Sequence, residues 1–449
     1  MKINMRLRMG ELSKLPQEMK VQILSRLPPK SLMRFKCVRR SWRALISSSN
    51  FAAKQVSASK DNKLSSTATI LFKRYVLDLS TERRDIVLSL LDLCNDDINR
   101  VDDDDNLKIP LEDLHVPLSM GLKRRDIWTG IECIELACHC NGIICLTDYR
   151  KRVVLCNPAI KEFNRLPVSS LALSAVEHKP QGSSTAAVGF GCDLKCEEYK
   201  IVRVLYTARE FHDNDIVIHP PRAEVYSLAT KCWKEIKVGD LDNGSKNVWP
   251  DSTVSICFKG YLYWRGHEDE KEYFDVPLSY TDEDANSGGE ETPTFFYEDK
   301  ERIISFDIES ETFHVMRFPN GYYYYHKVFG LWKDSIAVGL SWCADYQCVH
   351  IWVLDSNGGA EGSWINCFAI EPTVYIEFQL AFVGTRGQSI LVAVDKSVVV
   401  LYDYITKKVK YLPVNGVSLW STQALFYEYS VVSVKGCTDC SDRNLIQEA

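Results

Sequence analysis

The sequence predicts a mainly β protein that begins with a small α-helical module. Three observations lead to this fold class. Residues 1–60 show apolar residues at helical spacing and carry 14 Lys or Arg against only two acidic residues. The remainder contains short β-branched and aromatic runs that Gly, Asn, Asp and Pro interrupt. One unit within this remainder recurs along the chain, which is typical of a repeat architecture.

The composition excludes several protein classes. The chain has 449 residues, of which 45% are hydrophobic and 25% charged, so it is neither fibrous nor mostly disordered. A net charge of −6 argues against a nucleic-acid partner, and no apolar run is long enough to span a membrane. The N-terminus lacks the apolar core of a signal peptide, so the 16 Cys are expected to be reduced thiols. We therefore expect a cytoplasmic protein, with the nucleus as the alternative location.

Charge is unevenly distributed. Residues 1–60 have a balance of +12, whereas the rest of the chain has 40 basic and 58 acidic residues, a balance of −18. Residues 266–301 hold 13 acidic side chains against Lys271 and Lys300. Such runs are usually solvated loops, and the alternative is a docking surface for a basic partner. The candidate target-binding residues are Asp213, Asp215, Glu268, Asp269, Glu270, Asp282, Glu283 and Asp284.

The N-terminal module is predicted to contain three short helices. The first begins at Pro16 and is stopped by Pro28-Pro29. A second is expected over 31–35, and a third follows with apolar residues at i, i+4, i+7 and i+8. The apolar residues of the third are Val38, Trp42, Leu45 and Ile46. A unit of this size buries little on its own, which favours an apolar face that packs on a partner.

Basic residues between these apolar positions would also suit a DNA-binding helix–turn–helix. The acidic remainder of the chain and the lack of Asn or Gln in the third helix argue against that alternative.

The β-rich remainder contains a repeated hairpin unit. An apolar residue is followed by six polar or turn-like positions and then by an aromatic or β-branched residue. The unit occurs at Cys156–Phe163, Tyr226–Trp233, Phe306–Phe313 and Tyr402–Val409. Trp352 and Trp364 fit the same hairpin with a Gly-rich insertion, and further apolar strands precede each unit.

About four strands per repeat indicate kelch-like β-propeller blades. We predict six blades, with seven as the alternative. The strand expected over 429–434 would join the early strands 68–72 and 87–90, which would leave no exposed sheet edge.

Residues 12–51 resemble an F-box. The matches to its pattern are Leu15-Pro16, Ile23-Leu24, Leu27-Pro28, Ser31-Leu32, Arg34-Phe35, Val38, Trp42 and Leu45-Ile46. One departure is Arg39-Arg40, where relatives often carry Cys-Lys or Ser-Lys. The resemblance implies that the module binds the Skp adaptor of a cullin–RING ubiquitin ligase. The adaptor-binding residues it implies are Leu15, Pro16, Ile23, Leu24, Leu27, Leu32, Val38, Trp42 and Leu45.

The β-rich part resembles the plant F-box-associated domain. The segments that carry this likeness include CNGIICL, VVLCNPAIKEFNRLP, AEVYSLATKCWKEI and IISFDIESETFHVMRFP. LFKRY at 71–75 and the ending ALFYEYSVVSVKG look closest to S-locus F-box proteins, the pollen receptors that bind style ribonucleases in self-incompatibility. The domains implied are an F-box at 10–54, a linker at 55–67, a target-binding propeller at 68–436 and a flexible tail at 437–449.

The resulting prediction is a non-catalytic substrate receptor. Its implied partners are the Skp adaptor, through it the cullin and RING subunits, and a protein target such as a basic ribonuclease. Two alternatives remain: a receptor for an unrelated stress or signalling target, and a propeller lectin or enzyme with a vestigial F-box.

No catalytic, metal or cofactor site is expected. A metal cluster could be drawn from Cys133, Cys138, His139, Cys140 and Cys145. Neighbouring side chains of a strand point to opposite faces, however, so structural thiols are favoured.

Overall fold

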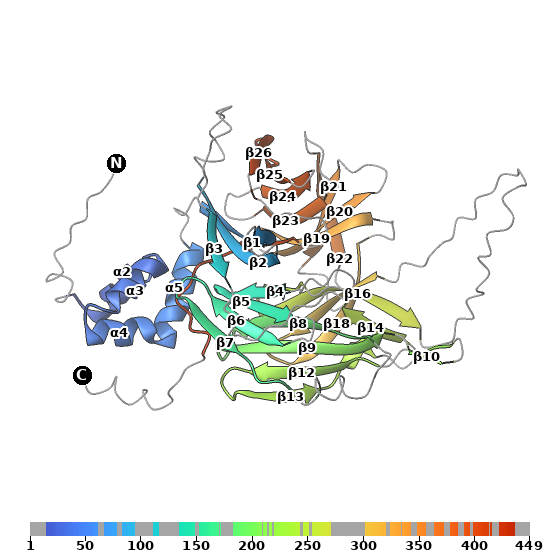
Figure 1. Ribbon diagram of the computed structural model, residues 1–449, viewed down its shortest axis with the longest axis horizontal. Coiled ribbons are helices and arrows are strands. Elements are labelled where there is room, and N and C mark those ends of the chain that lie inside the picture. Colours follow the sequence, from blue (N-terminus) through green and yellow to red (C-terminus); the bar gives the residue numbers. More distant parts are fainter. Residues whose placement is uncertain are drawn as a thin grey trace, which may run out of the picture. The chain divides into compact units, whose positions relative to one another are not determined.

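The computed structural model describes most of the helical module and of the β-rich region (Figure 1). The residues described are 15–61, 67–78, 83–94, 111–115, 134–148, 152–169, 171, 183–208, 210–212, 215–217, 220–242, 246–250, 254–270, 301–319, 324–333, 335–342, 348–355, 363–371, 378–384, 390–395, 398–412, 414 and 422–435. The chain divides into two compact units. The first consists of Met1–Leu166, Tyr325–Val353 and Cys367–Ala449, and the second of Pro167–Tyr324 and Leu354–Asn366.

Four helices form the module in the described residues. They are α2 (Gln17–Leu24), α3 (Pro29–Phe35), α4 (Arg40–Ser47) and α5 (Ser49–Asp61). The first three confirm the expected helices, and Pro29 stands at the first position of α3, where its missing N–H costs no hydrogen bond. Helix α5 was not expected. It continues to Asp61, so the first part of the segment expected as a linker, 55–67, is helical.

The β-rich region is built from strands that pair mainly in antiparallel fashion. In chain order they are β1 (Thr67–Asp78), β2 (Arg83–Cys94), β3 (Leu111–His115), β4 (Ile134–Cys140), β5 (Ile143–Asp148), β6 (Val153–Asn157), β7 (Glu162–Arg165), β8 (Ser183–Asp193), β9 (Glu198–Ala208), β10 (Glu210–His212), β11 (Asp215–Val217), β12 (Arg222–Ser227), β13 (Cys232–Ile236), β14 (Lys246–Pro250), β15 (Ile256–Phe258), β16 (Tyr261–Glu270), β17 (Glu301–Asp307), β18 (Thr312–Arg317), β19 (Tyr324–Trp332), β20 (Ser335–Trp342), β21 (Val349–Asp355), β22 (Ser363–Ile370), β23 (Phe378–Gly384), β24 (Ile390–Asp395), β25 (Val398–Asp403), β26 (Lys408–Leu412) and β27 (Gln423–Tyr427).

These strands make the six blades of a β-propeller fold, as predicted. In sheet order, blade 1 is β27-β1-β2-β3, blade 2 is β4-β5-β6-β7 and blade 3 is β13-β12-β9-β8. Blade 4 is β14-β16-β17-β18 with β15 also paired to β16. Blades 5 (β19 to β22) and 6 (β23 to β26) join into one sheet through parallel pairing of β19 with β23.

The repeated unit of the sequence is the outer hairpin of four blades. Its two end residues face each other across the ladder at Cys156↔Phe163, Tyr226↔Trp233, Phe306↔Phe313 and Tyr402↔Val409. Each turn has one residue with φ near +60°, at Lys161, Lys231, Glu311 and Lys407. A side chain at the start of each turn accepts a backbone N–H, as Asp403 does from Ile405 at 2.9 Å. This local bonding explains why the spacing is constant.

The strand that completes blade 1 differs from the one expected. β27 pairs with β1, from Thr69↔Tyr427 to Lys73↔Gln423, so the first and last strands of the β-rich region share one blade. The expected strand at 429–434 is not a strand. Its backbone groups bond to side chains instead: Val431 N–H donates to Gln55, and the Asn157 amide donates to the carbonyl oxygen of Val432.

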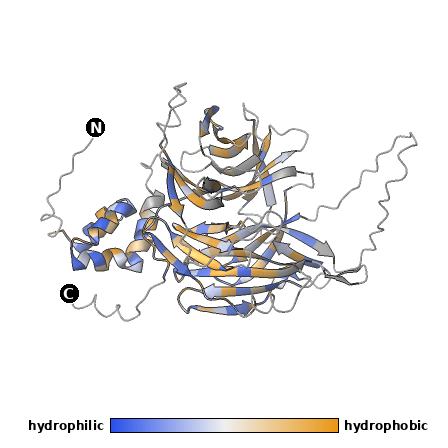
Figure 2. Ribbon diagram, in the orientation of Figure 1, coloured by the Kyte–Doolittle hydropathy of each residue, from blue (hydrophilic) through white to orange (hydrophobic). Residues whose placement is uncertain are grey.

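Apolar side chains fill the space between neighbouring blades of the first unit. Blades 1 and 6 share a core of buried residues from β1, β2, β24 and β25, including Phe72, Leu93 and Val394. Figure 2 shows apolar residues concentrated along the strands, whereas the helices of the module mix polar and apolar positions. Within the described residues, no helix has the length and apolar content needed to cross a membrane.

Candidate functional site

The helical module has a small core of its own. Leu24, Leu32 and Ile46 are almost fully buried, and Trp42 is 6% exposed. The ring of Trp42 packs edge-on against Phe35 with centroids 5.4 Å apart, which fixes α4 against α3. The core therefore determines how the outer surface of these helices is presented.

The structure divides the nine predicted adaptor-binding residues by exposure. Leu24, Leu32 and Trp42 lie in the core, so they support the surface rather than form it. The half-buried residues are Leu15, Ile23, Leu27 and Leu45, and the exposed ones are Pro16 and Val38. The six residues of these last two groups are the ones that a partner could touch.

One apolar surface residue was missing from the predicted set. Met19 is 47% exposed on α2, one helical turn before Ile23. Its spacing of four residues from Ile23 was visible in the sequence, and it extends the apolar surface of α2.

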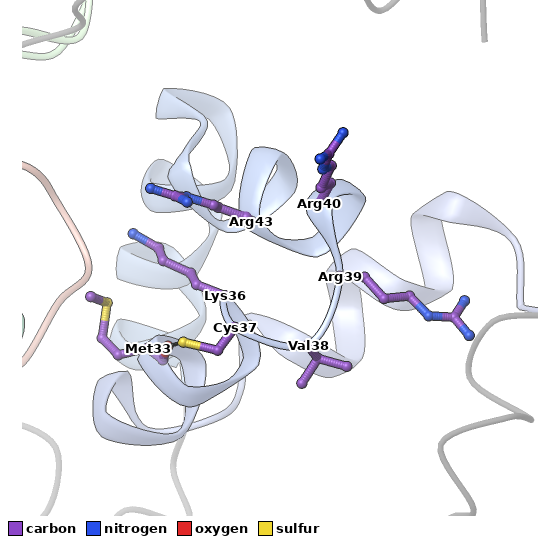
Figure 3. Close-up of a pocket in the computed structure, with 7 residues that line it drawn as sticks. All are labelled: Met33, Lys36, Cys37, Val38, Arg39, Arg40 and Arg43. Carbon is purple, nitrogen blue, oxygen red and sulfur yellow. Dashed lines mark hydrogen bonds between the residues drawn. The ribbon is translucent and has the colours of Figure 1, made fainter.

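A groove of about 550 Å³ lies between the end of α3 and the start of α4 (Figure 3). Its apolar lining residues are Met33, Cys37 and Val38, and its basic ones are Lys36, Arg39, Arg40 and Arg43. In Figure 3, Met33, Lys36 and Arg43 extend to one side, whereas Arg39 points to the other. We call these seven residues the basic groove.

Burial is the main effect on the one lysine of the basic groove. Lys36 is half-buried, and this burial lowers the pKa of its ammonium group. The negative charge of Glu162 in blade 2 acts against this shift, and it acts more strongly than the positive charge of Arg43 acts with it. Lys36 is therefore compensated by a carboxylate of blade 2, whereas no acidic residue lines the groove itself.

Within the first unit, the module packs on blades 1 and 2 through α5 and through the segment 428–435, which we call the strap. Phe51 and Val56 of α5 are buried, and the Gln55 side chain accepts the Val431 N–H at 3.3 Å. At the start of α3, Lys30 forms an exposed ion pair of 2.6 Å with Glu112 of β3. These contacts hold the module against blades 1 and 2.

Hydrogen bonds and close packing in turn hold the strap against blade 2. Asn157 is fully buried, and its amide donates to the carbonyl oxygens of Ser430 and Val432 at 3.2 and 2.8 Å. Gly142 has φ +78°, and a Cβ there would meet the Ser430 side chain at 2.4 Å. Only glycine fits this turn, because the strap lies directly upon it.

The predicted target-binding residues fall mostly at the edge of, or outside, the described chain. Asp213, Asp282, Glu283 and Asp284 lie outside the described residues. Asp215 starts β11, and Asp269 and Glu270 end β16; their side chains are not described. The position of β16 shows that the acidic stretch 266–301 connects β16 with β17 of blade 4.

Glu268 is held inside its own blade. Its carboxylate accepts hydrogen bonds from Lys246 at 2.8 Å and from Arg302 at 2.7 Å. Burial alone would raise the pKa of Glu268, but these two partners outweigh it and lower the pKa below its usual value. Glu268 therefore stabilises its own sheet and is not a free surface acid, unlike the role predicted for it.

The cysteines considered as a metal cluster lie within blade 2. Cys138 and Cys145 are buried and face each other across β4 and β5, and Cys140 is buried near the end of β4. Cys133 lies outside the described residues. Among the residues that are described, no three metal-binding side chains come together.

Two family comparisons match this chain. The F-box domain matches residues 12–54, and the F-box associated beta propeller domain matches residues 131–424. The second match alone covers more than half of the chain.

Similar proteins from Arabidopsis thaliana carry F-box names. An F-box/kelch-repeat protein is 32% identical over 49% of this chain and 50% of its own length. The F-box protein CPR1 is 22% identical over 66% of this chain and 67% of its own length. The chain thus spans about two fifths to two thirds of the length of the curated relatives it matches. Among solved structures, a PL25 ulvan lyase aligns with a TM-score of 0.35 at 9% identity, over 78% of this chain and 72% of its own.

Proposed function

Because the chain belongs to the F-box proteins with an F-box associated β-propeller domain, we propose that it is the substrate receptor of an SCF-type ubiquitin ligase. In this function the helical module binds the Skp adaptor, and through it the cullin and RING subunits. The propeller holds the target protein. The cytoplasm or the nucleus is the proposed location.

One observation carries the proposal: the module exposes apolar surface that its own core does not need. Val38 is 38% exposed and Met19 47%, although Leu24, Leu32 and Trp42 already make a closed core. Exposed apolar groups on a helical module are suited to a partner's groove.

The chain itself is proposed to perform no chemistry. The strap and α5 hold the module against blade 2 through the buried side chains of Gln55 and Asn157. A target held by the propeller would then be kept near the ubiquitin-charged subunits. Such proximity raises the effective concentration of a target lysine without a catalytic group in this chain.

The proposed target is a basic protein. The balance of −18 after residue 60 and the acidic stretch 266–301 support it, since complementary charge speeds association. The resemblance of LFKRY and ALFYEYSVVSVKG to S-locus sequences makes a style ribonuclease the specific target to test. An affinity that falls with rising salt is expected, whereas an affinity independent of salt would contradict a target held by charge.

Co-purification with the Skp adaptor tests the receptor function. The informative variant is Val38→Glu, which places a charge on the proposed interface without touching the module core. Val398→Glu is the matched control, because Val398 is 37% exposed on β25 of blade 6.

We expect the adaptor to co-purify with the wild type and with Val398→Glu, and to be lost from Val38→Glu. A folded wild-type chain that purifies without the adaptor at low salt would contradict the receptor function and favour a propeller with a ligand site of its own.

A further inference from the structure

Strand β22 is the outermost strand of blade 5, and it differs from the outermost strands of the other blades. The other five are β3, β7, β13, β18 and β26, each four to six residues long with at least one charged side chain. β22 has eight residues and no charged side chain. Proteins commonly use short length and charge to keep an outer strand from pairing with another chain, and β22 has neither protection.

β22 and β26 are the two ends of the same eight-stranded sheet, so they can be compared directly. β26 carries Lys408 and Lys410 at alternate positions. At alternate positions of β22 stand Ile365, which is 52% exposed, and Cys367, which is also exposed. Among the strands that the structure describes, only β21 pairs with β22. The outer backbone edge of β22 is therefore open to a further strand within this part of the chain.

The other side chains of β22 hold the strand in place. The ring N–H of Trp364 donates to the carbonyl oxygen of Arg317 at 3.1 Å. Phe368 packs against Trp332 with ring centroids 4.6 Å apart, and Ile370 is buried. An extended strand that is already fixed loses little conformational entropy when a second strand pairs with it.

Carboxylates stand at both ends of β22. Asp355 ends β21, with its carboxylate 3.5 Å from the hydroxyl of Ser363, and Glu371 is exposed directly after β22. Antiparallel pairing of β22 with a second copy of this chain would bring the Asp355 of each copy toward the Glu371 of the other. The balance of −18 after residue 60 would add to this repulsion. A segment with basic residues at its ends would complement both carboxylates instead.

We propose that β22 binds an extended segment of the target protein as an added strand. The core of this segment is apolar or β-branched and lies over Ile365 and Cys367. Its ends are basic and lie beside Asp355 and Glu371. Main-chain hydrogen bonds give such pairing its affinity, and side chains at alternate positions give it specificity. This inference rests on the proposed function, since the target is the partner of the propeller.

The first test is the titration of a labelled peptide into the complete chain. The peptide is as long as β22, alternates threonine with valine and has a lysine at each end. We expect saturable binding, and absence of binding would overturn the proposal.

Two control peptides separate strand pairing and charge from apolar adhesion. A peptide with an N-methyl group on each backbone nitrogen of its core cannot donate main-chain hydrogen bonds, and we expect it not to bind. A peptide with glutamates in place of the lysines should bind about tenfold more weakly at low salt. Equal binding of the methylated peptide would overturn strand pairing, and equal binding of the glutamate peptide would overturn the choice of a segment with basic ends.

Two double variants of the chain locate the binding. Ile365→Lys/Cys367→Lys gives β22 the kind of side chain that β26 has. Val398→Lys/Ile405→Lys adds the same charge at residues of blade 6 that are 37% and 70% exposed. Both variants change the net charge equally, so a difference in affinity between them belongs to β22.

We expect the lysine-ended peptide to bind Ile365→Lys/Cys367→Lys about tenfold more weakly than the wild type. Its affinity for Val398→Lys/Ile405→Lys should change by less than about twofold. Thermal melting checks that both variants fold. Equal affinities of the two folded variants would overturn the proposal, whereas co-purification of the adaptor would still support the receptor function.

Gel filtration of the chain without peptide tests the alternative occupant. We expect the wild type and Ile365→Lys/Cys367→Lys to elute alike. A wild-type dimer that becomes a monomer in this variant would make a second copy the occupant of β22 and overturn the choice of the target.

Discussion

The blades and the helical module differ in whether their cationic side chains are paired with carboxylates. In blade 3, Arg203 and Glu224 are each 2% exposed and form a pair of 2.9 Å, with Ser169 as a further partner. In blade 1, Arg74 binds Asp113 through both carboxylate oxygens at 2.8 and 2.9 Å. In the module, the arginines of the basic groove have no such partner among the described residues.

This contrast separates charges that are paired within the fold from charges that the fold leaves exposed. A buried cation needs a carboxylate within the same sheet, because an unpaired buried charge strongly destabilises a protein. An exposed cation can remain unpaired at little cost, and it then stays available to a ligand. The buried cations of blades 1 and 3 are therefore paired within their own sheets, whereas the arginines of the basic groove have no carboxylate partner among the described residues.

The largest expected effect is on the buried pair of blade 3. Arg203→Met should lower the free energy of unfolding by about 3–5 kcal/mol, because it leaves Glu224 buried without its cation. The double variant Arg203→Met/Glu224→Leu should recover much of this loss, and urea unfolding measures both. Equal losses of unfolding free energy in the single and double variants would show that packing around Arg203, rather than its charge, stabilises this part of blade 3.

A slightly smaller effect is expected where the module is fastened to the blades. Asn157→Leu removes the amide that bonds to the strap and should cost about 2–3 kcal/mol, because the carbonyl oxygens of Ser430 and Val432 and the Ser430 hydroxyl lose their donor. Asn164→Leu removes the single bond of 2.7 Å to Val434 from a less buried position and is the control. The comparison is made by urea unfolding and by proteolysis at the strap. A smaller loss for Asn157→Leu than for Asn164→Leu would contradict this account of the strap.

Lowering the pH should weaken the ion pairs that Glu268 forms with Lys246 and Arg302 in blade 4. The folded chain lowers the pKa of Glu268, so this carboxylate adds stability above its ordinary pKa of about 4.3, and the contribution is lost as pH falls through the lowered pKa. The difference in unfolding free energy between wild type and Glu268→Gln should therefore shrink as pH falls from about 7 to below about 4. A difference that grows as the pH falls would reverse the sign we derive.

The smallest effects on stability are expected for exposed charges of either region. Arg222→Gln breaks an exposed pair with Glu235 of 2.9 Å and should cost less than about 1 kcal/mol. Arg40→Gln/Arg43→Gln should likewise cost less than about 1 kcal/mol, because neither arginine has a carboxylate partner among the described residues. A clear loss of stability in this second variant, measured by thermal melting, would show that the groove cations support the module.

The architecture could be predicted in detail from local patterns. Tyr226 and Trp233 face each other as expected, because a turn with fixed hydrogen bonds and one left-handed residue sets the spacing of seven. The helices around Leu24 and Trp42 followed from apolar spacing and from Pro28-Pro29. Patterns of this kind depend only on neighbours within one turn or one hairpin.

Contacts between distant segments were not predictable in the same way. The buried run Val431-Val432 looked like a strand, but Gln55 and Asn157 satisfy its backbone in place of a neighbouring strand. Glu268 looked like a free surface acid, although Lys246 and Arg302 hold it. The sequence also could not tell core from surface among the nine adaptor-binding residues, since both kinds are apolar.

Titration calorimetry of the adaptor into the complete chain, at low and at high NaCl, tests the central claim most directly. The account predicts saturable binding, because the module exposes apolar surface that its own core does not need. A correctly folded chain that gives no binding at either salt concentration would contradict it.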